Sequence, residues 1–283
     1  MGSPSLAAAD LFGVSGLVAV ITGGGTGVGL MIAQGLEANG AIVYIIGRRK
    51  EALEKAAATA LHGNIRAIQA DVTRKEDLDG AVAQIKEACG YVNVVIANSG
   101  VPGPNLAGLP PNPTIVQYRD FMFNIDQQAF NDTFAVNNTA VFFTVAAFLE
   151  LLDEGNKRGF KQRSQVIATS SIGAFSREAK GFPYGASKAG INHMFKQLAT
   201  VLVPFNIRAN VICPGFYPSE MTTVMDAQHR AGWPKTVVPA ERSGDVEDMA
   251  GAALFLVSKA GAYINGNILN TDGGHIGVVP STY

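Results

Sequence analysis

The chain is poor in charge, in cysteine and in long apolar runs. Charged residues make up 16% of its 283 residues, well below the ~25% of an average soluble domain. Its 22 basic residues nearly balance 23 acidic ones, which leaves a net charge of −1. Nucleic-acid binding is therefore disfavoured, because that function depends on an excess of Lys and Arg to meet the phosphates.

The few cysteines and the first residues exclude further classes of protein. Cys89 and Cys213 are too few for a disulfide framework and lack the spacing of metal ligands, so we expect two small buried hydrophobic residues. Residues 1–10 lack the basic and apolar regions of a secretory signal. The longest apolar stretch, residues 140–152, is too short to span a bilayer. We expect a cytoplasmic protein with no membrane partner.

Apolar residues, at 47%, and 32 glycines dominate the composition instead, and they exclude a disordered chain. Runs typical of buried strands occupy residues 18–21, 42–46, 65–70, 92–97, 165–169, 208–213 and 267–271. Helical patterns lie between them, at residues 28–39, 48–61, 75–89, 130–152, 184–202 and 245–258. Apolar strands separated by helices indicate a parallel sheet covered on both faces. The sequence predicts an α/β fold: a Rossmann-type doubly wound sheet in three α/β/α layers, forming a single domain over residues 1–283.

Two segments interrupt this alternation. Residues 101–113 are rich in proline and glycine, and residues 216–242 contain three prolines and the only tryptophan. Both follow predicted strands, at the sheet edge where open α/β sheets bind ligands. We expect them to form the substrate loops. We expect the substrate pocket to be built from residues 101–112, 175–182 and 216–233. Aromatic residues in the last two of these segments predict that it binds an apolar, bulky or aromatic small molecule: Phe175, Phe182, Phe216, Tyr217 and Trp233. Arg177, Lys180 and His229 are candidates for binding a polar group of that molecule.

A glycine-rich segment, Thr22-Gly23-Gly24-Gly25-Thr26-Gly27-Val28-Gly29, connects the first predicted strand to the first helix. Glycines permit a tight turn and let a pyrophosphate approach the backbone, while the helix N-terminus offers free N–H groups. This context predicts a dinucleotide site. At the end of the second strand stand Arg48 and Arg49, where an NAD site would place a carboxylate. Two guanidiniums there favour NADP(H) over NAD(H), because they can bind a 2′-phosphate.

Tyr184 and Lys188 stand four residues apart in a predicted helix and so share one of its faces. A phenol has a pKa of about 10 and needs a nearby cation to exchange protons at neutral pH. Lys188 can supply that charge. Ser171 follows the strand predicted at residues 165–169, and Asn137 lies within a predicted helix.

With these residues in view, the sequence resembles the short-chain dehydrogenase/reductase family from Leu17 to Gly274. The motifs that carry the likeness occur in the family's order: the Thr22–Gly29 pattern, Asp71-Val72, Asn98-Ser99-Gly100, Asn137, Ser171, Tyr184-x3-Lys188, Pro214-Gly215 and Asp272-Gly273-Gly274. The resemblance implies hydride transfer between a nicotinamide cofactor and a ketone or secondary alcohol.

The resemblance also assigns roles within the site. It implies that Tyr184 donates the proton, Ser171 holds the carbonyl oxygen, Lys188 anchors ribose and lowers the Tyr184 pKa, and Asn137 supports a relay water. The residues implied to bind the cofactor are Gly23, Gly25, Thr26, Gly27, Val28, Gly29, Arg48, Arg49, Asp71, Val72, Asn98, Gly100, Tyr184, Lys188, Pro214, Gly215 and Ser219. Of these, Asp71 would contact adenine and Ser219 the carboxamide side. No metal is expected.

The sequence departs from the family's pattern in three places. Ser99 stands where Ala is usual, Ser219 stands where Thr is usual, and the stretch between Asn98 and Asn137 is long. We predict an NADP(H)-dependent carbonyl reductase or alcohol dehydrogenase that forms a homodimer or homotetramer. Two alternatives stay open: a non-redox biosynthetic enzyme and a cofactor-binding scaffold on the same fold. The tail after Gly274 could cover its own site or a neighbour's.

Overall fold

The computed structural model describes residues 5–178, 181–223, 228–229 and 232–283. Within them, one sheet of seven parallel strands has the order β3-β2-β1-β4-β5-β6-β7. The strands are β1 (Val18–Thr22), β2 (Ile42–Gly47), β3 (Ile65–Gln69), β4 (Val94–Ala97), β5 (Gln165–Thr169), β6 (Arg208–Pro214) and β7 (Ile268–Thr271). The predicted doubly wound α/β fold is confirmed.

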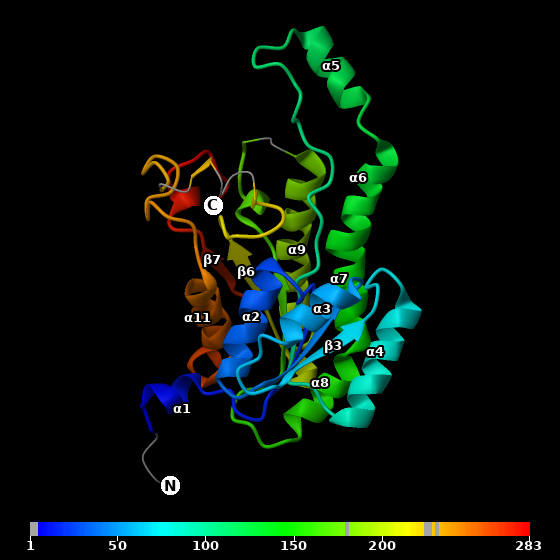
Figure 1. Ribbon diagram of the computed structural model, residues 1–283, viewed down its shortest axis with the longest axis vertical. Helices are drawn as coiled ribbons and strands as arrows, with labels where there is room; N and C mark the ends of the chain where they lie inside the picture. Colours follow the sequence, from blue (N-terminus) through cyan, green and yellow to red (C-terminus); the bar gives the residue numbers. More distant parts are fainter. Residues whose placement is uncertain (1–4, 179–180, 224–227, 230–231) are drawn as a thin grey trace.

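Helices cover both faces of the sheet (Figure 1). The helices include α2 (Gly27–Ala38), α3 (Lys50–Ala57), α4 (Lys75–Ala88), α6 (Gln127–Phe134), α7 (Ala140–Ala147), α8 (Leu149–Asn156), α9 (Phe182–Val201) and α11 (Val246–Val257). Helices α2, α3 and α11 pack on one face, and α4, α7, α8 and α9 on the other. Gly35 permits the close approach of α2 and α11, because a Cβ there would lie 2.5 Å from that of Ala250.

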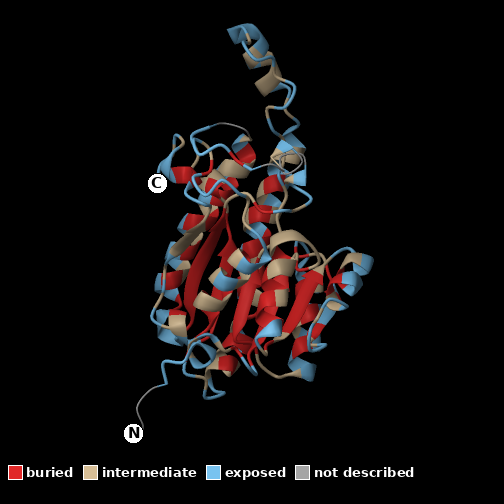
Figure 2. Ribbon diagram, turned by 60° about the vertical axis from the view of Figure 1, so that its left-hand side comes forward, coloured by how far each residue is buried: buried red, intermediate tan, exposed pale blue. Residues whose placement is uncertain are grey.

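The strands form the centre of the hydrophobic core (Figure 2). All five residues of β1 and all seven of β6 are buried. Phe148 and Phe195 are fully buried against one face, and Leu36 and Leu256 against the other. Each such side chain stabilises the fold by about 1.5–3 kcal/mol through removal of apolar surface from water. Strands buried on both faces explain why the sequence shows continuous apolar runs rather than alternation.

The single helix predicted at residues 130–152 is wrong. A π-helical segment, η1 (Ala135–Thr139), interrupts it, and it breaks again at Phe148. The backbone bends by 48° there, between the segments Gln127–Ala147 and Leu149–Asn156. No single helix among the described residues is long and apolar enough to cross a membrane, although this bent pair meets the criteria of length and composition. A continuous apolar pattern does not reveal a π bulge, because the bulge changes hydrogen bonding rather than residue type.

Some of the described helices lie where none was predicted. The short α1 (Ala8–Phe12) precedes the sheet, and α5 (Ile115–Phe123) follows the proline-rich segment. Helix α5 begins at a capping box formed by Thr114 and Gln117. It stands at the tip of an arm that projects from the body beside α6, and none of its residues is buried (Figure 1, Figure 2).

The strand order reverses between β1 and β4. Loops leaving these neighbouring strands turn to opposite faces of the sheet, so a crevice opens between them at the carboxyl ends. The glycine-rich segment follows β1, and Asn98 follows β4. The sheet therefore brings two motifs that lie 70 residues apart to one crevice.

Candidate functional site

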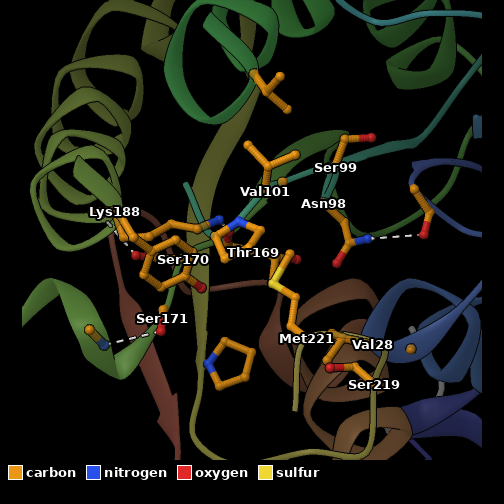
Figure 3. Close-up of a pocket in the computed structure, with 18 of the residues that line it drawn as sticks. Val28, Asn98, Ser99, Val101, Thr169, Ser170, Ser171, Lys188, Ser219 and Met221 are labelled. Atoms are coloured by element: carbon orange, nitrogen blue, oxygen red, sulfur yellow. Dashed lines mark hydrogen bonds between the residues drawn. The ribbon is translucent and has the colours of Figure 1, made fainter. Parts of the chain in front are cut away.

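A cleft of about 1240 Å³ lies along the carboxyl ends of the strands. This volume exceeds the ~300–1,000 Å³ of a typical small-molecule site, which leaves room for two ligands side by side. Figure 3 shows Thr169, Ser171 and Lys188 on one side of it, Val28 and Ser219 on the other, and Met221 extending between them. Every predicted cofactor-binding residue except Gly29 lines this cleft, as do Ser171, Tyr184 and Lys188.

The glycine-rich loop fits a phosphate. Gly23 has a φ of +65°, which L side chains rarely adopt. Gly29 lies beneath the loop, where an added Cβ would lie 2.4 Å from Gly23 O and 2.5 Å from Asn98 Nδ2. The Thr26 side chain makes no capping hydrogen bond to α2, so the first N–H groups of the helix are available to an anion at the positive end of its dipole. The residues present therefore fit the pyrophosphate of a dinucleotide.

Charged residues mark the far end of the cleft, beyond β2 and β3. Arg48, Arg49 and Asp71 all line it. Burial raises the pKa of the Asp71 carboxyl, but hydrogen bonds from Thr73 and the charge of Arg48 outweigh burial and lower it. Arg49 forms an ion pair with Glu220, a residue of the loop after β6.

Asn98 ties the ends of β1 and β4 together. Its backbone N–H donates to Thr22 Oγ1 at 3.0 Å, and its Nδ2 donates to Thr22 O at 3.0 Å. The N–H of Ser99 also donates to Thr22 Oγ1, at 3.1 Å. Thr22 belongs to the glycine motif, but sequence reasoning gave it no role of its own. Its hydroxyl holds the two loops at a constant separation.

Ser171, Tyr184 and Lys188 come together at the carboxyl end of β5. Ser171 Oγ accepts a hydrogen bond from Gly173 N at 3.0 Å. Lys188 Nζ donates to Thr169 O at 2.8 Å and lies 5.8 Å from the centroid of the Tyr184 ring. Lys188 is 4% exposed, so its ammonium is held at a fixed point beside the phenol. The carbonyl of Thr169 is a partner that no side-chain pattern could indicate.

Burial dominates the ionisation of this group. It lowers the pKa of Lys188 to about 8, because an ammonium loses hydration there. Burial also raises the pKa of Tyr184, and a hydrogen bond with Ser171 offsets only part of that rise. The resemblance implied that Lys188 would lower the Tyr184 pKa. The groups of the protein itself instead raise the Tyr184 pKa, because the loss of hydration disfavours the phenolate more than the hydrogen bond with Ser171 stabilises it.

Asn137 lies in the π-helical segment η1, behind the wall of the cleft, and is fully buried. Its Oδ1 accepts from Val101 N at 2.9 Å, and its Nδ2 donates to Val101 O and Ser187 Oγ, both at 3.0 Å. Because the bulge directs this side chain at the loop after β4, Asn137 fixes the start of the proline-rich segment relative to the helix that carries Tyr184.

The ends of β6 and β7 complete the cleft. Gly215 packs against Asp272, where an added Cβ would lie 2.7 Å from its Cα. Ser219 packs on the glycine loop, 3.1 Å from the position of a Cβ on Gly27. A Cβ added at Gly100 would lie 3.4 Å from Lys188 Nζ. None of these positions has room for a larger residue without a shift.

The aromatic residues expected around the substrate divide into two groups. Phe182, Phe216 and Tyr217 line the cleft, whereas Phe175 and Trp233 do not. Trp233 is buried and stacks against Phe216 at 4.3 Å between ring centroids, and its indole N–H donates to Ser243. The Trp233 ring, held by Ser243, thus packs against Phe216 and supports its position in the cleft wall. Arg177 lines the cleft, His229 stacks on Trp233, and Lys180 lies outside the described residues.

The C-terminal tail pairs with the segment that follows Ser171. Ser281 forms an antiparallel bridge with Ser176. Arg177 N donates to Pro280 O at 2.9 Å, and Thr282 N donates to Phe175 O at 2.8 Å. His275, which no motif indicated, is buried and lines the cleft beside Phe216. The tail therefore holds the segment that follows Ser171.

Comparisons with known proteins agree with this arrangement. The family model described as short chain dehydrogenase matches residues 17–230. The chain is 49% identical to the short-chain dehydrogenase/reductase PhomF of Diaporthe leptostromiformis, over 99% of this chain and 98% of that protein. It is 31% identical to the 5-keto-D-gluconate 5-reductase of Escherichia coli K12, over 94% and 97%. The structure of the Pseudomonas aeruginosa RhlG/NADP active-site complex is similar, with a TM-score of 0.78 and 29% identity over 94% of this chain and 98% of that one.

Proposed function

The chain belongs to the short-chain dehydrogenase family, and on that premise we propose that it reduces the ketone of an apolar small molecule with NADP(H). One observation carries this proposal: Ser171, Tyr184 and Lys188 line the same cleft as the glycine loop. A nicotinamide bound there would supply the hydride, while the protein supplies orientation and a proton. Relatives of the chain include ketone reductases and dehydrogenases.

The chemistry assigned to the protein is the stabilisation and protonation of an alkoxide. Tyr184 and Ser171 donate hydrogen bonds to the carbonyl oxygen, where negative charge develops. The raised pKa of Tyr184 keeps the phenol protonated, as an acid for reduction must be. Lys188, as an ammonium, stabilises the phenolate that remains after proton transfer. Asn137 keeps Val101 and Ser187 in place around this group.

The preference for NADP(H) rests on Arg48 and Arg49. Both line the end of the cleft beyond β2, where the ribose 2′ position lies in dinucleotide sites of this topology. The neighbouring structure in complex with NADP supports the same choice.

The nature of the substrate rests on Phe182, Phe216 and Tyr217, which give the open side of the cleft an apolar lining. We also propose that the protein is cytoplasmic and forms a homodimer or homotetramer. Cell fractionation and light scattering of the purified protein would check these two points.

The experiment is consumption of NADPH, followed at 340 nm, with a panel of ketones. The panel contains aromatic and aliphatic ketones, 5-keto-D-gluconate and a 3-oxoacyl thioester, because relatives of the chain are named for the last two. Tyr184→Phe removes only the acidic hydroxyl, and loss of a general acid lowers the rate by about 10²- to 10⁴-fold. NADPH affinity should stay within about threefold of wild type, because the apolar ring remains.

Three outcomes are decisive. Turnover by the wild type and its loss in Tyr184→Phe supports the reductase. Binding of NADPH without oxidation of the cofactor by any ketone contradicts it and favours the cofactor-binding scaffold. Conversion of a substrate without any change in NADPH favours the non-redox enzyme.

A further inference from the structure

An ion pair joins the two sides of the cleft at its outer rim. Arg49 donates from Nη1 to Glu220 Oε1 at 2.9 Å and from Nη2 to Oε2 at 3.0 Å. A guanidinium meets carboxylates and phosphates with this same two-pronged geometry. Glu220 therefore occupies the donors of Arg49 that a 2′-phosphate would use.

A hydrogen-bonded turn delivers Glu220 to this position. Thr222 Oγ1 accepts from Ser219 N at 2.9 Å and donates to Tyr217 O at 2.6 Å. Thr223 Oγ1 donates to Ser219 O at 3.0 Å. The turn also packs on the glycine loop through Ser219, at the close approach to Gly27. The carboxylate is consequently presented by local structure and does not depend on Arg49 alone.

The same guanidinium contacts the phosphate loop. Arg49 Nη2 lies 3.4 Å from Thr26 Oγ1, the hydroxyl of the residue that caps α2. Arg49 thus bridges the glycine loop and the loop after β6. A phosphate at the ribose 2′ position would add about 1.5–2 negative charges, next to a carboxylate that carries one.

We propose that Glu220 is a specificity-determining residue for the cofactor: its carboxylate competes with the 2′-phosphate of NADP(H) for Arg49. NADH carries a hydroxyl at this position, so its binding leaves the ion pair intact. The chain then selects NADP(H) less strongly than Arg48 and Arg49 alone would. This inference rests on the proposed function, because it requires that the cleft bind a nicotinamide dinucleotide.

The test is a double-mutant cycle on cofactor affinity, measured by calorimetry with NADPH and NADH on the full chain. Glu220→Gln keeps the shape of the side chain and removes its charge. The pair is exposed, at 61% and 64% of the two side chains, so solvent screens it. We expect the Kd for NADPH to fall about three- to tenfold and that for NADH to change by less than about twofold. Adenosine 2′,5′-bisphosphate should repeat the NADPH result and adenosine 5′-monophosphate the NADH result.

The other variants separate direct competition from a general charge effect. In the Arg49→Ser background, Glu220→Gln should change the NADPH Kd by less than about twofold, because the shared partner is absent. Glu51→Gln is the matched control: it removes the same charge from the first turn of α3, where the described residues give Glu51 no ion pair. This control should change the Kd of either cofactor by less than about twofold.

Salt gives an independent readout. Raising the ionic strength from about 20 mM to about 500 mM should reduce the gain in NADPH affinity that Glu220→Gln produces, because salt screens the interactions between exposed charges. An NADPH/NADH ratio unchanged by Glu220→Gln, or effects of Glu220→Gln and Arg49→Ser that simply add, overturns the inference and leaves the proposed function standing. A wild type that binds neither cofactor overturns the proposed function itself.

Discussion

The two sides of the cleft differ in how their backbone is held. On the cofactor side, the glycine loop and the ends of β1, β4 and β6 leave no space at Gly29 or Gly215, where a Cβ would meet backbone atoms at 2.4 and 2.7 Å. On the substrate side, the cleft is bordered by the loop that leads to the exposed α5, by Phe182 and Phe216, and by His275 at the start of the C-terminal tail.

This difference implies that the cofactor side carries the chemistry of the reaction and the substrate side its selectivity. The sheet determines the cofactor side, because its loops begin at buried strands whose positions the core sets. The substrate side is attached to that scaffold through a few hydrogen bonds, so its sequence can change without disturbing the sheet. Substitutions should therefore affect turnover and stability strongly on the first side, and substrate affinity more weakly on the second.

The largest effect is expected at the boundary between the two sides, at Lys188. Lys188→Met removes the charge beside Tyr184 and should lower kcat/KM for ketone reduction by about 10²- to 10⁴-fold. In the wild type, burial lowers the pKa of Lys188 to about 8. The ammonium loses its proton as pH rises through that value, so kcat/KM for reduction should be constant below pH 8 and fall above it. Stopped-flow measurement between pH 6 and 10 checks both points. A profile that stays flat to pH 10 contradicts this role.

Lys196→Met is the matched control for that substitution. Lys196 lies two turns further along α9, is exposed, and donates to Gly266 O. The variant should keep the activity and the pH profile of the wild type.

The next largest effect is expected on stability, from substitution of Asn137. Asn137→Ala leaves Val101 N–H and C=O without partners, and each unsatisfied buried group costs about 1–3 kcal/mol. The free energy of unfolding, measured with urea, should fall by about 2–6 kcal/mol when both groups lose their partners. Asn131→Ala, at an exposed position of α6, should change it by less than about 0.5 kcal/mol. Equal stabilities of the two variants would show that the π bulge does not anchor the proline-rich loop.

A smaller loss of stability is expected from steric crowding on the cofactor side. Gly29→Ala forces a Cβ against Gly23 O, and overpacking of this kind costs about 1–3 kcal/mol. For a chain of this size that lowers Tm by roughly 2–12 °C, and the NADPH Kd should rise at least about tenfold as the loop shifts. Gly277→Ala, on the substrate side, has no atom within 4 Å of the new Cβ and should change neither quantity. A Gly29→Ala variant with wild-type Tm and Kd would show that both sides tolerate change equally.

The smallest effect is expected from the tail. Thr282→Pro removes the N–H that donates to Phe175 O at 2.8 Å, a hydrogen bond worth about 0.5–1.5 kcal/mol. The KM for the ketone should rise about two- to fivefold, with kcat and the NADPH Kd unchanged, because the segment after Ser171 loosens on the substrate side alone. Thr282→Ala keeps the N–H and loses only the longer hydrogen bond from Thr282 Oγ1 to Phe175 O, at 3.3 Å, so it should change the ketone KM by less than about twofold. A change in NADPH affinity would mean that the tail also supports the cofactor side.

Sequence patterns were informative wherever neighbours in the chain decide the structure. Every predicted strand lies within two residues of the observed one. The inner strands β1, β4, β5 and β6 are buried throughout, so most of their residues are apolar and stand out in the sequence. The order of the motifs also indicated a cleft that contains Tyr184 and Lys188, since parallel strands end at one edge. The break at Asn137 and the helix α5 were not predicted, because a π bulge uses ordinary residues and proline-rich flanks hide a short helix.

The sequence by itself determined the α/β class, the strand positions and the residues that could carry a reductase reaction. The class and the strand positions follow from side-chain periodicity and from glycine and proline chemistry, which act over a few residues. The candidate reductase residues follow from the resemblance of their motifs to those of the short-chain dehydrogenase/reductase family. The tertiary structure alone decided that the tail pairs with the segment after Ser171, that Asn137 holds Val101, and that Glu220 meets Arg49 across 171 positions of sequence. Such contacts depend on where long loops return to the sheet, and that path is set by packing across the whole molecule rather than by the residues adjacent in the chain.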